Sequence, residues 1–166
     1  MSEELFNIET YRTDVQKEQD GVVCYISGIG DKGPGFRIRS TLNNPEFVEL
    51  DRQLAIKYQD KLRSSNSKLA LETLHNIKVE LLTKTLITEA VRFVYPGTTK
   101  AWKYTPESGQ KLFSQSGYSH IVELLMEFAG NTSNYRFEAP TEEEVDKAAD
   151  AVKKVSSSGK RTRKNK

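Results

Sequence analysis

Alternating apolar and polar positions predict two short strands near the start of the chain. Residues 22–27, VVCYIS, are β-branched and aromatic and are bounded by glycines, while residues 36–40, FRIRS, alternate apolar side chains with arginines. The segment between them, GIGDKGPG, favours a loop at every position, so the pattern predicts a β-hairpin. Because side chains alternate across a strand, we expect Phe36 and Ile38 on the buried face and the two arginines on the outer face.

Apolar residues at three- and four-residue steps predict helices over most of the remaining chain. Asn44 and Pro45 are typical of a helix start, with a capping side chain before a proline at the first helical position. The stripe that follows comprises Phe47, Leu50, Leu54, Tyr58 and Leu62. A longer apolar face predicts a second helix over about residues 68–94, which ends before Pro96.

Three further helices are expected beyond that proline. Thr105-Pro106-Glu107 combines a capping hydroxyl with an acid in the first turn, and a fourth helix over 119–129 follows Gly117. Residues 141–144, TEEE, form a capping box for a last, marginal helix at about 142–155. The order predicts an α+β fold, in which a short N-terminal β-hairpin packs on a mainly helical body of four to five helices.

Composition divides the chain into four parts. We expect a polar arm or weakly anchored first element at 1–20, a single α+β domain at 21–135, a linker with the marginal helix at 136–152, and a disordered basic tail at 153–166. The net charge is +2, and the tail holds seven Lys or Arg and no acid, so the preceding residues carry −5 by difference. The basic residues are Lys153, Lys154, Lys160, Arg161, Arg163, Lys164 and Lys166.

Motifs that suggest chemistry have simpler structural explanations. Residues 28–33, GIGDKG, match a dinucleotide fingerprint, but Pro34 and a strand follow where phosphate binding needs a helix N-terminus. His75, His120 and Cys24 have no partners at metal-ligand spacing, and nothing in the sequence supports a Cys–His nucleophile pair. The candidate acids and bases are scattered. The sequence therefore predicts neither an enzyme nor a cofactor.

Charge and hydropathy also bear on location and partners. No apolar run reaches the roughly 18 residues of a membrane span, and the N-terminus lacks the apolar region of a signal peptide. The single cysteine fits a reducing compartment. We therefore expect a cytoplasmic protein. The basic tail is able to bind nucleic acid nonspecifically. No aromatic residue lies among its basic residues and the rest of the chain is acidic, so nucleic acid is a minor expectation.

Residues 102–135 carry the most specific pattern. Trp102 precedes the Tyr104-Thr105-Pro106-Glu107 helix start, a short apolar helix, a break, an amphipathic helix and Asn134-Tyr135. This pattern resembles the C-terminal half of the phage tail assembly chaperones, and the similarity extends over about 20–135 to the hairpin and the charged helices. Taken alone, Trp102 and Tyr104 suggest either a ligand-stacking face or core packing, and core packing is the commoner role.

The resemblance implies a non-enzymatic protein that binds a phage tape-measure protein and a tail-tube protein. It also implies that this protein acts in the cytoplasm of a bacterial host and is able to self-associate. A helical protein can cover the apolar stripe of a long helix in this way. The surface expected to bind the partner comprises Trp102, Tyr104, Phe113, Leu125 and Phe128. Two alternatives remain: a structural tail or connector protein retained in the virion, and a small nucleic-acid-binding or inhibitor protein that acts through the basic tail.

Overall fold

The computed structural model describes residues 7–137, and the described residues up to Arg136 form one compact unit. The linker and marginal helix expected at 136–152 lie outside the described residues apart from residues 136 and 137, and the basic tail at 153–166 lies wholly outside them. The described part is an α+β fold, which confirms the predicted class.

A three-stranded antiparallel sheet forms one layer of the fold. Its strands are β1 (Val22–Tyr25), β2 (Gly35–Ile38) and β3 (Ile87–Val91), in the order β1-β2-β3. The β1–β2 hairpin was predicted, and its alternation is confirmed because Phe36 and Ile38 are buried while Arg37 is partly exposed. The glycine-rich segment makes a single 3-10 turn at Gly30–Lys32 and leads directly into β2, so it is the hairpin loop.

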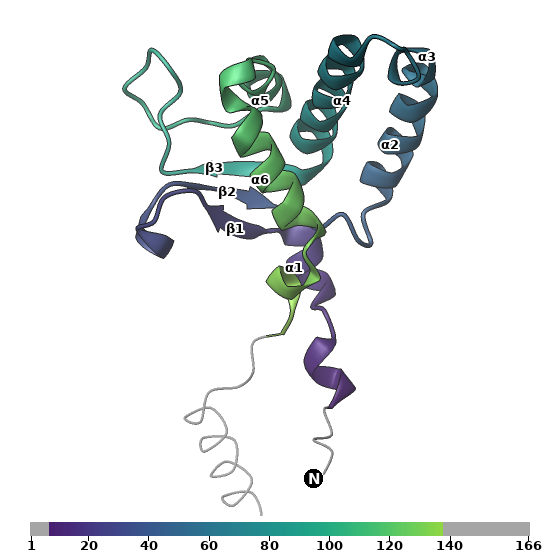
Figure 1. The fold of residues 1–166 in the computed structure, drawn as a ribbon. Helices are drawn as coiled ribbons and strands as arrows, with labels where there is room; N and C mark the ends of the chain where they lie inside the picture. The colour runs from purple at the N-terminus through teal and green to yellow at the C-terminus, as the bar shows by residue number, and fades with distance from the viewer. Residues whose placement is uncertain (1–6, 138–166) are drawn as a thin grey trace, which may run out of the picture. The chain divides into compact units, whose positions relative to one another are not determined.

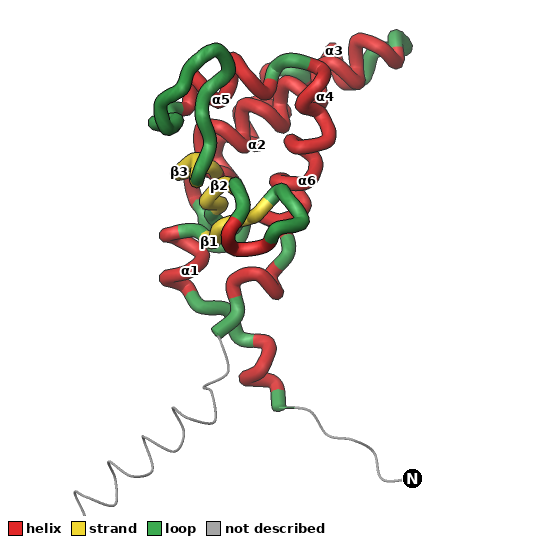
Figure 2. The backbone as a smooth tube through the Cα atoms, turned by 90° about the vertical axis from the view of Figure 1, so that its left-hand side faces the viewer, coloured by secondary structure: helices red, strands yellow, loops and turns green. Residues whose placement is uncertain are grey.

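Six α-helices accompany the sheet in the described part of the chain. They are α1 (Val15–Asp20), α2 (Pro45–Lys57), α3 (Gln59–Leu62), α4 (Ser67–Leu81), α5 (Pro106–Phe113) and α6 (Ser119–Gly130). Figure 1 shows α4 between α2 and the α5–α6 pair, and Figure 2 shows the strands, in yellow, to one side of α6. The main core lies between the sheet and α4, α5 and α6, and a smaller cluster joins α2 to α4 through Leu54, Ile77 and Leu81.

The helix predicted over 68–94 is wrong in its second half. Helix α4 ends at Leu81, residues Leu82–Leu86 form a π-helical turn, and the chain then enters β3. Thr83 and Thr85 donate their hydroxyls to the carbonyls of Val79 and Leu81, a bond that bends helices. The β-branched Ile87 and the open edge of β2 then favour a strand.

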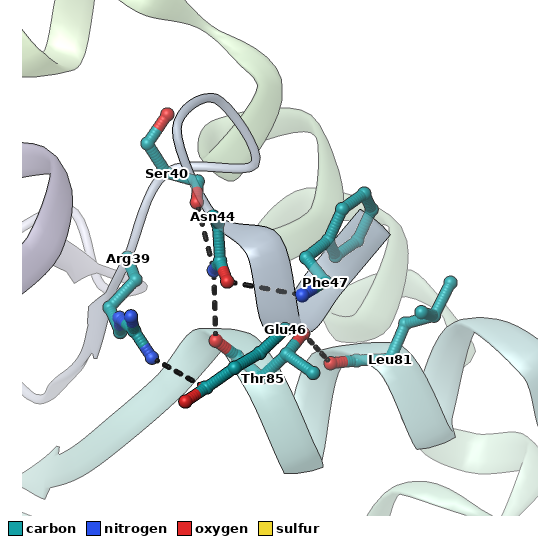
Figure 3. Close-up of polar contacts among 7 residues, drawn as sticks. All are labelled: Arg39, Ser40, Asn44, Glu46, Phe47, Leu81 and Thr85. Atoms are coloured by element: carbon teal, nitrogen blue, oxygen red, sulfur yellow. Dashed lines mark hydrogen bonds and ion pairs between the residues drawn. The ribbon is translucent and has the colours of Figure 1, made fainter. Parts of the chain in front are cut away.

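A buried asparagine joins α2 to the segments that follow β2 and precede β3 (Figure 3). Asn44 caps α2, since its Oδ1 accepts from the amide of Phe47, while its Nδ2 donates to the carbonyls of Ser40 and Thr85, both at 3.2 Å. Beside it, Arg39 pairs with Glu46 at 3.0 Å. The predicted helix start is confirmed, and one side chain connects three segments of the chain.

Residues 14–20 are anchored more firmly than a polar arm. Asp14 caps α1 and donates its amide to the carbonyl of Tyr135 at 2.7 Å. Glu18 is buried, accepts from Nδ2 of Asn43 at 2.7 Å, and its carbonyl accepts from the amide of Ser40. The domain therefore begins before residue 21, because a buried carboxylate that binds the β2–α2 loop holds α1 in place.

Candidate partner-binding pocket

Trp102 is held in place by the loop that follows β3. Its amide donates to the carbonyl of Phe93 at 2.7 Å, and Val94 forms a β-bridge with Ala101. Its indole Nε1 donates to Oγ of Ser108 at 3.1 Å, and Ser108 also completes the capping box of α5. Trp102 is 8% exposed, so it belongs to the core, which is the commoner of the two roles considered for it.

Phe36 is the centre of an aromatic cluster in which Trp102 takes part. The centroid of the Phe36 ring lies 4.9 Å from that of Phe93, 5.6 Å from Phe113 and 5.8 Å from Trp102. Tyr95 approaches Trp102 edge-on at 5.2 Å. Such geometries add stabilisation beyond the area buried, so these rings form a packed aromatic base.

An apolar pocket of about 160 Å³ opens above these rings. Phe36, Trp102 and Phe113 line it from the core, and Val94 and Ile121 line it from the loop after β3 and from α6. An apolar cavity of about 150 Å³ is able to hold a benzene-sized group. Among residues 7–137, no charged side chain lines the pocket, so its chemistry suits one aliphatic or aromatic side chain.

Tyr104 has a structural role beside the pocket. Its hydroxyl donates to the carbonyl of Thr83 at 2.7 Å, and burial, with a smaller effect of Glu107, raises its pKa well above the usual range. The ring lies against α5 at Gly109, where an added Cβ would come 2.7 Å from Cε2 of Tyr104. The hydroxyl therefore stays neutral and joins α5 to the turn after α4.

The five residues expected to form a partner-binding surface are all buried or partly buried. Trp102 and Phe113 line the pocket from the core side, whereas Tyr104 packs beneath α5. Leu125 is fully buried, and Phe128 is partly buried with its ring centroid 6.2 Å from that of Tyr135. Leu125 is buried because helical periodicity places it on the face of α6 that fills the core. Partner binding by the five residues stays a prediction.

The outer residues of the pocket were missed by the sequence analysis. Phe93 and Val94 were assigned to the end of a long helix, but they belong to the loop that follows β3, and Val94 is 54% exposed. Pro96, where that helix was expected to stop, lies in the same loop. Tyr118 and Ile121 complete the wall from the start of α6. The Pro96-Gly97 turn was the one available signal, since it marks a loop, and Gly97 has a φ of 80°.

The other groups considered for chemistry have structural surroundings in the described part of the chain. Nε2 of His75 lies 3.0 Å from the carbonyl oxygen of Phe113, His120 is exposed, and burial raises the pKa of the Cys24 thiol. Among residues 7–137, no three His, Cys, Asp or Glu side chains are grouped to hold a metal ion. Within the same residues, the helices are too short or too polar to cross a membrane.

Comparison with known proteins gives no family for the chain. No protein-family model matches it, and neither the curated proteins nor the solved structures include a significant match.

Proposed function

We propose that this protein is a non-enzymatic phage tail assembly chaperone that binds tape-measure and tail-tube proteins during tail assembly. Two kinds of observation support the proposal. The first is the resemblance of residues 102–135 to that family. The second is the apolar pocket beside Trp102, which is suited to a side chain supplied by another protein.

The pocket is the observation that carries the proposal. It is open to the surface, and its base is the packed aromatic cluster of Phe36, Trp102 and Phe113. A preformed base limits the entropy lost on binding, because these rings are already ordered. Large apolar side chains that fill such pockets are typical anchors of protein–protein interfaces.

The size of the pocket fits a chaperone that must be released. A tape-measure protein is a long helix with an exposed apolar stripe, which would self-associate unless covered. A pocket of about 160 Å³ takes one side chain from such a helix, so each bound copy contributes a small, reversible contact. Many copies along one helix then protect the stripe together, and assembly of the tube can displace them one at a time.

The proposal is tested by capture of the tagged full-length protein from phage-producing cells, with mass spectrometry of the proteins that accompany it. We expect a long helical tape-measure protein and a tube protein in the captured fraction, and we expect the chaperone to be absent from purified particles. A stoichiometric copy number in the particles would contradict the proposal and indicate a structural tail protein. Capture of nucleic acid that is lost on removal of residues 153–166 would instead indicate action through the basic tail.

A further inference from the structure

Strand β1 is an edge of the sheet, and its free side faces away from β2 (Figure 1). Within residues 7–137 it pairs only with β2, in a register that places Cys24 opposite Phe36. The amide of Ile26 donates to the carbonyl of Pro34, so Cys24, two residues earlier, also has its polar backbone groups directed toward β2. By the same alternation, the amide and carbonyl groups of Val23 and Tyr25 point outward.

The two edges of the sheet differ in how they are protected. β3 carries a bulge opposite Arg37 and Ile38, and its Glu89 is exposed. Bulges and charged side chains are the usual features that prevent edge strands from pairing with other chains. β1 has the sequence VVCY, with no charge, no proline and no bulge, and all four residues favour strands or tolerate them.

We propose that β1 pairs antiparallel with β1 of a second copy of this chain, about a two-fold axis at Cys24. This register places Val23 opposite Tyr25 of the other copy, and Tyr25 opposite its Val23. The outward amide and carbonyl groups of Val23 and Tyr25 in each strand are then all hydrogen-bonded to the other copy. The two sheets become one six-stranded sheet, in keeping with the isologous contacts typical of homodimers.

The side chains of the outer sheet face agree with this register. Val23 is partly buried and Tyr25 is exposed, so both are available to a second copy. A β-branched residue opposite an aromatic one is a favourable cross-strand pair, and the two-fold axis makes the pair twice. The contact is small, so we expect a dimer that forms reversibly as concentration rises.

A pair of charge variants of the full-length protein tests both the contact and its register. Val23→Lys with Tyr25→Glu places opposite charges across the proposed junction, whereas Val23→Lys with Tyr25→Lys places like charges there. Measured by sedimentation equilibrium, the first variant should retain the dimer, and the second should dissociate about tenfold more readily or more. Equal dissociation constants for the two variants would overturn the proposal, as would a wild-type protein that stays monomeric up to millimolar concentration.

Hydrogen exchange of the wild-type protein gives a second test that does not depend on the folding of variants. The amides of Val23 and Tyr25 should exchange rapidly in dilute solution and become protected at high concentration. The Cys24 amide faces β2, so it should be protected at both concentrations and serves as the internal control. Exchange at Val23 and Tyr25 that does not change with concentration would overturn the proposal.

Discussion

At the scale of single residues, Asn44 shows how one side chain can join several segments of the chain. It is 3% exposed, and it satisfies the amide of Phe47 together with the carbonyls of Ser40 and Thr85 (Figure 3). The helix cap could be predicted because an asparagine before proline is a common start signal. The two donated bonds could not, because Thr85 is 41 positions away and its carbonyl is freed only where α4 gives way to a π-helical turn.

Replacement of this asparagine should therefore destabilise the fold strongly. Asn44→Ala removes the cap of α2 and leaves two buried carbonyls without a donor, so we expect a loss of about 3 kcal/mol in the free energy of unfolding. Urea denaturation followed by circular dichroism measures the change.

Asn66 provides the matched control for that substitution. Its Oδ1 caps α4 by accepting from the amide of Leu69 at 3.2 Å, but the residue is exposed, and within residues 7–137 its side chain makes no hydrogen bond to a distant segment. Asn66→Ala should cost only the cap, about 1 kcal/mol. Equal losses for the two variants would contradict the role assigned to the buried donated bonds.

At the scale of elements, the sequence predicted the hairpin and most helix starts, and it failed at β3. The hairpin has local signals, since Phe36 and Ile38 alternate with arginines beside a glycine-rich loop. Residues 82–94 continue the apolar helical spacing of α4, so periodicity alone predicts one helix. The strand forms because β2 offers an unpaired edge, which is a tertiary effect that no local pattern contains.

Helix α1 also could not be predicted from the spacing of apolar residues. Its only buried residue is Glu18, a residue type that is rarely buried unless paired. Burial depends on Asn43, whose φ of 52° belongs to the left-handed region that asparagine tolerates. A polar sequence therefore predicted an arm, although its carboxylate has a partner in the loop before α2.

The contact between α5 and Tyr104 gives a prediction at this scale. Gly109→Ala should raise helix propensity, yet the new Cβ would lie 2.7 Å from Cε2 and 2.9 Å from Oη of Tyr104. We expect the clash to outweigh the propensity gain of about 1 kcal/mol, with a net loss of about 1–2 kcal/mol in the free energy of unfolding. Thermal or urea unfolding measures the difference.

Gly117 is the control for the same change. An added Cβ there meets no atom within 4 Å, and the residue lies in the turn between α5 and α6. Gly117→Ala should leave stability within about 0.5 kcal/mol of the wild type, as for other surface substitutions. A stable Gly109→Ala variant would show that Tyr104 is not confined by α5.

At the scale of the whole molecule, the fold class could be predicted and the pocket could not. The class follows from strands that precede helices, an order visible in the sequence. The pocket is built from the hairpin, the loop after β3, α5 and the start of α6. These segments are separated by tens of residues, so which aromatic rings meet, and which of them face solvent, depends on packing that only the structure describes.

The central claim is that the pocket beside Trp102 binds an apolar side chain of a helical partner. Val94 lies at its rim and is 54% exposed, while Ile56 is a similar β-branched residue, 63% exposed, on α2. Lysine at either position should leave the fold intact, since both side chains are largely in solvent. Only the change at Val94 places a charge beside the pocket, where it must be desolvated when a partner binds.

The most direct measurement is the affinity of the wild type, Val94→Lys and Ile56→Lys for helical segments of the tape-measure protein that we expect the capture experiment to recover, by titration calorimetry. Val94→Lys should weaken binding about tenfold, equivalent to about 1.4 kcal/mol, and Ile56→Lys should bind as the wild type does. Wild-type affinity in the Val94→Lys variant, or an equal loss in both variants, would contradict the account.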